Sequence, residues 1–458
     1  MPWLQDKLNL LSSIIWGEYL LIPLLAIVGI YLTIGLRAMP WRKIPLAFQT
    51  LWQGRKESSQ NKGDISPFQA LMTALSATVG TGNIAGVATA IYFGGPGAIF
   101  WMWVIAIFGM ATKYAEAVLA VSYRETDALG NYVGGPMYYI RNGLGDNWRW
   151  MAASFAFFAM IAAFGIGNMV QSNSVADEIH SSFNIPTWLT GAVISVLASL
   201  VIIGGVKRIA QVASKLVPFM AAIYILAALV IILLNIEKLP AAFLLIIESA
   251  FTGSAASGGF LGASIWMAIR WGFARGIFSN EAGLGSAPIA HAAAQTTDPV
   301  KQGMVAMLGT FIDTLILCSL TAFVIIITGA WDSGLQGAPM SSRAFSIGLY
   351  GYGGYIVSFG LVLFAFSTIL GWSYYGERCA SYLFGTKIII YYRIVWIIAI
   401  FIGAVVKLEL VWAFADVLNG LMALPNLIAL LLLSPIVFSK TRQYFNNKNS
   451  TWSLTRKI

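Results

Sequence analysis

The feature that most constrains this chain is a series of apolar runs, each about 20 residues long, which is the length that spans the hydrocarbon core of a bilayer. Hydrophobic residues make up 58% of the 458 residues, and charged residues make up only 10%. An average soluble domain carries about 25% charged residues, so this chain has too little charge to cover a water-facing surface. We therefore predict a polytopic integral membrane protein.

The apolar runs predict an all-α fold with 11 transmembrane helices. Lipid offers no hydrogen-bond partners to the backbone, so each run must be helical or sheltered by helices. The runs are about twice as long as a barrel strand and do not alternate apolar with polar residues, which argues against a β-barrel. The candidate spans are residues 17–36, 66–93, 97–122, 151–180, 187–206, 214–235, 262–293, 300–329, 354–384, 388–407 and 411–438.

The placement of Lys and Arg predicts the orientation. Of the 28 basic residues, 21 fall in the C-terminal tail and in the loops on one side, and 4 fall on the opposite side. Because the side rich in Lys and Arg faces the cytoplasm, we expect an outside N-terminus and a cytoplasmic C-terminus. The net charge of +9 thus has a topological meaning and does not indicate nucleic-acid binding. The polar tail, 439–458, is expected to be disordered or to lie on lipid headgroups.

Sequence signatures of membrane enzymes and ATP-driven pumps are missing. The two cysteines have no C-x-x-C spacing, and two histidines are too few for a metal cluster. The sequence contains no H-E-x-x-H zinc motif and no Walker motif. We therefore expect a transporter without a cofactor, driven by an ion gradient, and not an enzyme.

Two of the spans carry polar, glycine-rich interruptions. The second span contains Ser76-Ala-Thr-Val-Gly-Thr-Gly-Asn83, and the seventh contains Phe278-Ser-Asn-Glu-Ala-Gly-Leu-Gly285. Glycine costs a helix interior about 1 kcal/mol relative to alanine, so both clusters predict unwound backbone. Close helix packing through small residues is the alternative. The two spans open successive groups of five, and matched interruptions of this kind indicate a transporter binding site at the membrane midplane.

Unwound helix ends offer a particular chemistry. A break exposes amides on one side and carbonyls on the other. Amides at a positive dipole end suit a carboxylate, whereas carbonyls suit an ammonium group or a bare sodium ion. Both ends of an amino acid could therefore be held with few charged side chains.

At these residues the sequence resembles the sodium:alanine symporters, the alanine or glycine:cation symporter family. The resemblance extends over almost all of residues 15–438. The motifs that carry it are long and lie at residues 69–86, 94–103, 165–171, 278–288 and 367–377.

The resemblance implies a leucine-transporter-like fold with two inverted five-helix repeats, 66–235 and 262–438, preceded by one extra helix within 1–36. It also implies sodium-coupled symport of small neutral amino acids (L-alanine, D-alanine or glycine) into the cell by alternating access. Proton coupling and a glutamine-type substrate stay open. The expected location is a bacterial or archaeal plasma membrane, with lipid, sodium and the amino acid as partners and no obligatory protein partner.

The resemblance also implies roles for individual residues. Thr78 would line the substrate pocket, Asn83 would brace the break, and Gln171 would reach the substrate. The amides around Thr81 and Gly82 would bind the carboxylate. Carbonyls near Phe278 and Ser279 would bind the ammonium group beside Asn280, and Trp372 would limit the pocket. The implied sodium ligands are the carbonyls of Ser76 and Val79 with the hydroxyls of Ser367 and Thr368, and all-oxygen ligation of this kind suits a hard cation.

Structural alternatives exist for several of these residues. Ser367 and Thr368 could bond back to carbonyls of their own helix, Gln171 could link two helices, and Trp372 could pack in the core.

Several ionisable residues fall within the spans, where charge is costly and usually functional. For Glu281 we expect a structural role, bracing the unwound loop through its amides or pairing with Arg275. Asp313 could lie on a coupling path or act as a protonated hydrogen-bond donor. Lys113 and Glu116 have the spacing of a local ion pair.

Overall fold

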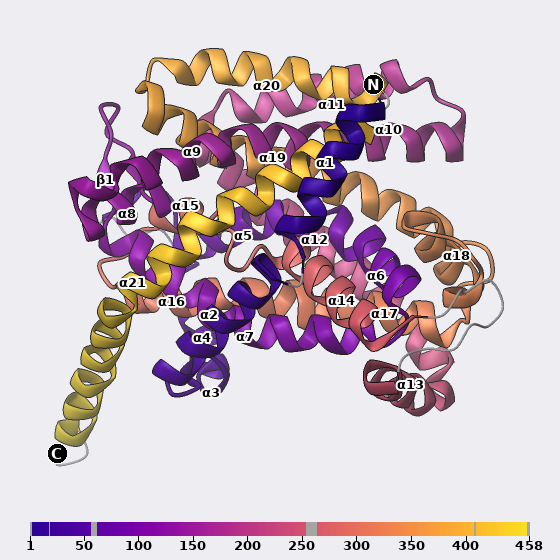
Figure 1. Ribbon diagram of the computed structural model, residues 1–458, viewed down its shortest axis with the longest axis horizontal. Coiled ribbons are helices and arrows are strands. Elements are labelled where there is room, and N and C mark those ends of the chain that lie inside the picture. Colours follow the sequence, from indigo (N-terminus) through magenta and orange to yellow (C-terminus); the bar gives the residue numbers. More distant parts are fainter. Residues whose placement is uncertain (1, 18, 56–61, 253–262, 407–408, 456–458) are drawn as a thin grey trace.

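The computed structural model describes residues 2–17, 19–55, 62–252, 263–406 and 409–455 of the chain (Figure 1). Several predicted segments therefore fall partly outside the described residues. The residues concerned are 1 and 18 in the N-terminal segment, 262, 407 and 408 in the second repeat, and 456–458 in the tail.

Every candidate span contains helix. Seven of the spans are interrupted neither by a non-helical break nor by a π-helical turn, and they correspond to α2 (Leu21–Gly35), α7 (Ala98–Ser122), α11 (Thr187–Ile202), α12 (Gly205–Leu234), α19 (Gly353–Phe384), α20 (Ile388–Val405) and α21 (Glu409–Thr455). The others are divided into α5 (Pro67–Thr78), η1 (Gly82–Gly86) and α6 (Val87–Gly94); α9 (Arg149–Phe164), η3 (Gly165–Met169) and α10 (Val170–Phe183); α14 (Ile265–Asn280) and α15 (Ala287–Ala292); and α16 (Pro299–Thr310), η5 (Phe311–Cys318) and α17 (Ser319–Ile327).

Length and hydropathy alone identify fewer spans than the eleven predicted. Within the described residues, seven helices are long and apolar enough to cross a membrane, and the bent pair of α5 with η1 and α6 makes eight. The helices α2 and α11 are apolar but shorter, with 15 and 16 residues. A multi-pass helical membrane protein is thus established, and the number eleven stays a prediction.

Further short helices connect or flank the spans. They are α1 (Pro2–Ile15), α3 (Met39–Arg42), α4 (Ile44–Gln53), α8 (Pro136–Leu144), η2 (Asp146–Trp148), η4 (Ile236–Lys238), α13 (Leu239–Thr252), η6 (Ala330–Asp332) and α18 (Ala338–Gly348). The tail is helical and not disordered, because α21 continues without a break to Thr455. Its placement on lipid headgroups, the other expected arrangement, stays a prediction. Figure 1 shows this helix crossing the molecule and extending beyond the other helices at its C-terminal end.

The all-α prediction was wrong in one detail. A small antiparallel hairpin joins α7 to α8, with β1 (Glu125–Thr126) paired to β2 (Tyr132–Val133). Asp127 stabilises the turn, because its Oδ1 accepts hydrogen bonds from the amides of Leu129 and Asn131, both at 2.9 Å. A two-residue strand is too short to leave a hydrophobic period in the sequence.

Small residues allow the central helices to approach closely. A Cβ atom placed on Gly272 of α14 would lie 2.4 Å from the Ala98 carbonyl oxygen of α7, and one on Gly276 would lie 2.9 Å from Ile105 Cγ2. Glycines four residues apart thus form the α14–α7 contact, as is common between membrane helices. This contact fixes α14, which carries the second interrupted segment.

Candidate functional site

The first interruption breaks a span into two helices at an angle of 54°. The helix α5 ends at Thr78, and the next segment begins with the π-helical turn η1. A Cβ atom on Gly80 would lie 2.5 Å from Thr368 Oγ1 of α19 and 3.8 Å from Gln171 Oε1 of α10. Glycine is therefore required at this position, because any larger residue would occupy the space in front of these two polar atoms.

The second interruption is a true loop, residues 281–286. Glu281 follows α14 with φ +56°, and Gly283 and Gly285 have φ values of +91° and +82°. Left-handed backbone of this kind is readily adopted by glycine. The paired glycines seen in the sequence therefore have a direct conformational cause.

Glu116 of α7 stabilises this loop from the side. Its Oε1 accepts hydrogen bonds from the amides of Gly283 and Gly285, both at 3.1 Å, and from Asn426 Nδ2 at 2.7 Å. Asn426 also donates to the Gly283 carbonyl at 2.9 Å. The predicted local ion pair with Lys113 was wrong, since Lys113 Nζ is buried without a hydrogen-bond partner among the described residues. The loop amides, which have no helical partner, take the Glu116 carboxylate instead.

Glu281 joins the loop to α19. Its Oε1 accepts a hydrogen bond from Trp372 Nε1 at 2.9 Å, and its Oε2 accepts one from Ser286 Oγ at 2.5 Å. The predicted partners, the loop amides and Arg275, are not the ones it uses. Trp372 is thereby held in place, and it also packs against the backbone at Gly167 of η3, where an added Cβ would lie only 2.1 Å from Trp372 Cβ.

The two interrupted segments touch each other. A Cβ atom on Gly82 would lie 3.3 Å from Ser279 Cα and 3.5 Å from Phe278 Cδ1. The space beside Gly82 is therefore filled by α14. Thr81, which precedes it, is buried as well.

Asp313 of η5 links both segments through its carboxylate. Its Oδ1 accepts from Asn83 Nδ2 at 2.7 Å, and its Oδ2 accepts from Ser279 Oγ at 2.8 Å and from Thr314 Oγ1 at 2.9 Å. The Asn83 side chain also spans the first interruption, because its Oδ1 accepts from the Gly80 amide at 3.0 Å. These three donors stabilise a negative charge on the carboxylate, which burial by itself disfavours.

Asn280 completes this network. Its Nδ2 donates to Thr314 Oγ1 at 3.0 Å, and its Oδ1 accepts from the Ala282 amide at 2.9 Å. The side chains of Asn83, Ser279 and Asn280 are therefore all used in bonds to η5 or within their own segments. The sequence did not point to Asp313 as the common partner, although its position inside a span marked it as unusual.

The four predicted sodium ligands lie where α5 meets α19. Ser367 Oγ is 3.4 Å from the Val79 carbonyl oxygen and donates to the Phe364 carbonyl at 2.8 Å. Thr368 Oγ1 also donates to that carbonyl, at 3.0 Å. Ser76 is close by, because a Cβ on Gly371 of α19 would lie 2.8 Å from Ser76 Oγ. The back-bonding alternative is thus present, and a hydroxyl that donates to a carbonyl keeps oxygen lone pairs for a cation.

Gln171 and Thr78, two predicted substrate residues, differ in how far their side chains are hydrogen-bonded. Gln171 Nε2 donates to the Ile166 carbonyl at 2.9 Å, while its Oε1 is buried and has no partner among the described residues. Thr78 Oγ1 lies 3.3 Å from the Ala74 carbonyl of its own helix. A buried amide oxygen without a donor is uncommon and marks the place where a donor from a ligand would fit.

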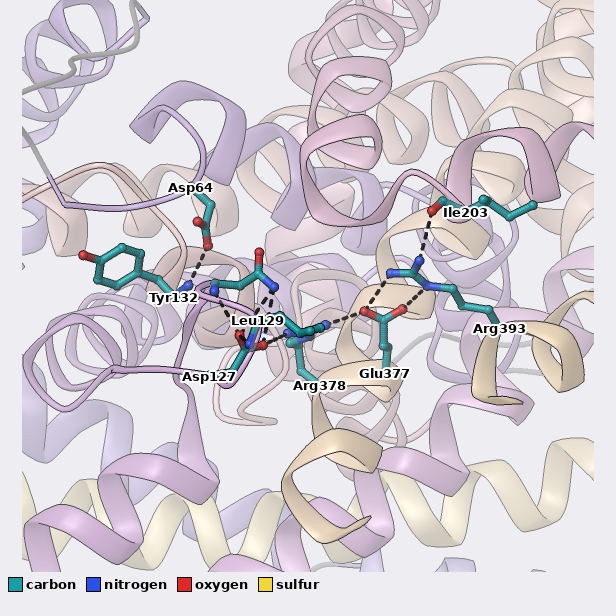
Figure 2. Close-up of polar contacts among 9 residues, drawn as sticks. Asp64, Asp127, Leu129, Tyr132, Ile203, Glu377, Arg378 and Arg393 are labelled. Atoms are coloured by element: carbon teal, nitrogen blue, oxygen red, sulfur yellow. Dashed lines mark hydrogen bonds and ion pairs between the residues drawn. The ribbon is translucent and has the colours of Figure 1, made fainter. Parts of the chain in front are cut away.

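A charged cluster lies at the far end of α19 (Figure 2). Arg378 donates to Asp127 Oδ2 of the hairpin at 3.0 Å and to Glu377 Oε1 at 2.6 Å. Arg393 of α20 donates to Glu377 Oε2 at 2.5 Å and to the Ile203 carbonyl, which follows α11, at 3.0 Å. The cluster ties α19 and α20 to the hairpin and to the end of α11.

The same region holds the start of the first interrupted span and the end of the second. Asp64 Oδ2 accepts from the Tyr132 amide of the hairpin at 2.7 Å (Figure 2), and burial raises the pKa of the Asp64 carboxyl. Ile65 forms a parallel bridge with Ala294, which follows α15. Arg124 donates to the Ala294 carbonyl at 2.7 Å. The start of α5 and the end of α15 are thus closed against each other at this end.

Comparison with known proteins identifies the chain. The sequence profile described as the Sodium:alanine symporter family matches residues 1–457. The chain belongs to this family. It is a membrane transporter and not an enzyme, and membership supports amino acid:cation symport.

Several relatives of this sodium:alanine symporter family member are similar over nearly their full length. An uncharacterised transporter of Haemophilus influenzae is 53% identical, with 96% of each chain covered. The sodium/alanine symporter AgcS of Methanococcus maripaludis is 52% identical, covering 95% of this chain and 96% of the relative. The probable sodium/glutamine symporter GlnT of Bacillus subtilis is 40% identical, covering 98% and 92%.

A solved structure shows the fold of this family member. MhsT in complex with L-phenylalanine is similar with a TM-score of 0.54, covering 83% of this chain and 99% of that chain at 13% identity. At this identity the likeness establishes the fold alone, which is that of the leucine-transporter type.

Proposed function

We propose that this protein is a secondary active transporter that couples the inward movement of sodium to uptake of a small neutral amino acid. The proposal extends family membership, which supports amino acid:cation symport, to a specific ion and substrate class. L-alanine, D-alanine and glycine are the proposed substrates.

The observation that carries the proposal is the close approach of two polar side chains to the Gly80 backbone. There the Thr368 hydroxyl and Gln171 Oε1, which has no hydrogen-bond partner among the described residues, approach a backbone that has no side chain. Gln171 Oε1 can only accept a hydrogen bond, so it suits the ammonium group of an amino acid. A substrate would satisfy a buried acceptor that otherwise lacks a partner, which favours binding.

Sodium would bind at the α5–α19 contact. The carbonyls of Ser76 and Val79 and the hydroxyls of Ser367 and Thr368 would be its ligands, and neutral oxygen donors suit a hard monovalent cation. Thr368 would touch both the ion and the substrate. A shared residue of this kind would couple the two binding events, because each ligand then favours the same position of the hydroxyl.

The substrate would lie between the two interrupted segments. Amides around Thr81 and Gly82 would bind its carboxylate, and carbonyls of Phe278 and Ser279 would bind its ammonium group. Because α14 fills the space beside Gly82, the substrate would approach from the α10 and α19 side. Its ammonium group would then face Gln171 Oε1 and its carboxylate would face the amides around Thr81 and Gly82. Trp372, fixed by Glu281, would close that side and restrict the pocket to small side chains.

Alternating access would use the two repeats, 66–235 and 262–438, as moving parts. The bonds of Asp64 and Arg124 would open at the cytoplasmic end when the site faces inward. The predicted location in a bacterial or archaeal plasma membrane belongs to this proposal. So does the predicted orientation, with the N-terminus outside the cell and the C-terminus in the cytoplasm.

Uptake of labelled alanine by proteoliposomes tests the proposal. An inward sodium gradient should drive accumulation, and a proton gradient in potassium buffer should not. Unlabelled glycine and D-alanine should compete, and glutamine should compete poorly. Accumulation driven by protons alone, or stronger competition by glutamine than by alanine, would instead support the proton-coupled or glutamine-type alternative.

A further inference from the structure

A basic pocket lies where the end of α2, the short helix α3 and the C-terminal part of α21 meet. It encloses about 340 Å³. Leu36, Met39 and Phe438 supply apolar walls, and Arg37, Arg42, Lys43 and Arg442 supply the charge. None of these residues belongs to the transport site or to the charged cluster of Figure 2.

The pocket is built on a close helix crossing. A Cβ atom on Gly35 of α2 would lie 2.1 Å from Phe438 Cζ of α21. Tyr31 packs against the same ring with 5.9 Å between centroids, and its hydroxyl is 3.1 Å from Ser434 Oγ. The chain then turns sharply through Arg37 and Ala38, both with φ +54°. The turn places Arg37 on the rim, next to residues of α21 that are distant in sequence.

No acidic side chain among the described residues pairs with the basic residues of the pocket. The sequence contains no Asp or Glu in residues 19–56 or 417–458. Within the described residues, Arg37, Arg42 and Arg442 form no ion pair and no side-chain hydrogen bond, and Lys43 only lies over the Phe445 ring at 5.4 Å. Guanidinium groups gathered without counter-charges repel one another, and a bound anion with several oxygens would relieve this, because arginine pairs well with phosphate.

An apolar stripe on α2 leads into the pocket. Ile27, Ile30, Tyr31 and Ile34 are 59%, 39%, 44% and 71% exposed, and their spacing places them on one face of the helix. Arg37 follows Ile34 by three residues. A membrane span that ends in a basic cluster of this kind presents a lipid-facing surface for an acyl chain directly below cations for its headgroup.

We propose that this pocket binds the headgroup of an anionic phospholipid, with one acyl chain along the Ile27–Ile34 stripe. A basic pocket between helices on the cytoplasmic side is a recognised form of lipid recognition. The occupied site would tie α2 to α21 and would leave the identity of the transported amino acid unaffected. Free phosphate offers the same anionic phosphate oxygens as the headgroup, but only the lipid has an acyl chain that would use the stripe.

Lipid binding to the purified full-length transporter tests the proposal. Binding of phosphatidylglycerol and of phosphatidylcholine would be measured by native mass spectrometry for the wild type, for Arg37→Gln/Arg42→Gln/Arg442→Gln, and for a matched control. The control, Lys207→Gln/Arg208→Gln/Lys215→Gln, removes the same charge from the same predicted side of the membrane. We expect the pocket variant to bind phosphatidylglycerol at least about tenfold more weakly, since each basic residue near an anionic lipid adds to the binding free energy.

The comparison between variants decides the result. The control should bind phosphatidylglycerol like the wild type, and phosphatidylcholine binding should be equal in all three proteins. If both triple variants bound phosphatidylglycerol equally weakly, the pocket would not be the binding site, and the loss of net charge would explain the result. Displacement of the lipid by inorganic phosphate or by the chain-free glycerophosphodiester at equal concentration would refute the lipid as the ligand and would favour a free anion.

Folding is checked independently. Thermal unfolding in phosphatidylcholine should be the same for the wild type and the pocket variant, because the substituted side chains are on the rim. If the triple variant unfolds early, Arg442→Gln alone carries the test, since this side chain is exposed on α21. Unchanged phosphatidylglycerol affinity in Arg442→Gln would then refute the proposal.

Discussion

The carboxylate of Asp313 holds the two interrupted segments in register, and replacing it by an amide tests this directly. Asp313→Asn keeps the shape of the side chain and removes its charge. Three hydrogen bonds of 2.7, 2.8 and 2.9 Å, from Asn83, Ser279 and Thr314, would change from charge-assisted to neutral. A bond to a charged group contributes about 1.5–3 kcal/mol and a neutral one about 0.5–1.5, so each bond should weaken by about 1 kcal/mol.

The expected result is a loss of substrate affinity. If all three weakened bonds were felt in the bound state, about 3 kcal/mol would raise the alanine dissociation constant by about two orders of magnitude. Because an amide can still pair with Asn83 and with the two hydroxyls, we expect a rise of about tenfold to a hundredfold. Equilibrium binding of labelled alanine to the purified transporter, at fixed saturating sodium, measures it.

A control and a double-mutant cycle separate this effect from general damage. Thr310→Val, one turn away on the same helix, replaces a buried hydroxyl that has no partner among the described residues and should leave binding unchanged. Ser279→Ala combined with Asp313→Asn should cost less than the sum of the single changes, by at least about 0.5 kcal/mol. Unaltered alanine affinity in a well-folded Asp313→Asn protein, or strict additivity with Ser279→Ala, would refute the linking role.

Three further predictions concern the ion, the contact between the segments and the orientation. Thr368→Val should raise the sodium concentration for half-maximal alanine uptake, with transport restored at saturating sodium; an unmoved half-saturation would reject the ligand role. Gly82→Leu should abolish alanine binding because the side chain would collide with α14, whereas Gly86→Ala should be tolerated, since nothing lies within 4 Å of its Cβ position; binding by the leucine variant would contradict the contact. Cysteine introduced at Gln5 should react with an impermeant reagent from outside the cell, and cysteine at Asn449 should not; the reverse labelling would show that the predicted orientation is wrong.

Much of the fold could be predicted from local sequence. Apolar runs of bilayer length identified where the helices lie, because a backbone in lipid has few alternatives to helix. The sites of interruption were equally readable. Gly283 and Gly285 adopt φ values of +91° and +82°, which glycine permits and most other residues resist.

Features with weak local signals were missed. The hairpin that contains Asp127 consists of two-residue strands, and its importance comes from the ion pair with Arg378. The tail was expected to be disordered or to lie on lipid headgroups because it is polar and basic, and α21 in fact runs on to Thr455 as a helix. Helix propensity in a polar segment is a weak guide when the segment continues a long helix.

The partners of the buried polar groups were decided only by the tertiary structure. Glu116 was assigned to Lys113, three residues away, but it binds the amides of a loop 167 residues further along the chain. Asp313 bonds to Asn83, which is 230 residues earlier. The sequence by itself determined that such groups must be satisfied, because an unpaired polar atom in a membrane is costly. It did not determine by which donor, because every nearby amide or hydroxyl meets the same chemical need. Only the packing of α7, α14 and η5 brings a particular donor within hydrogen-bonding distance.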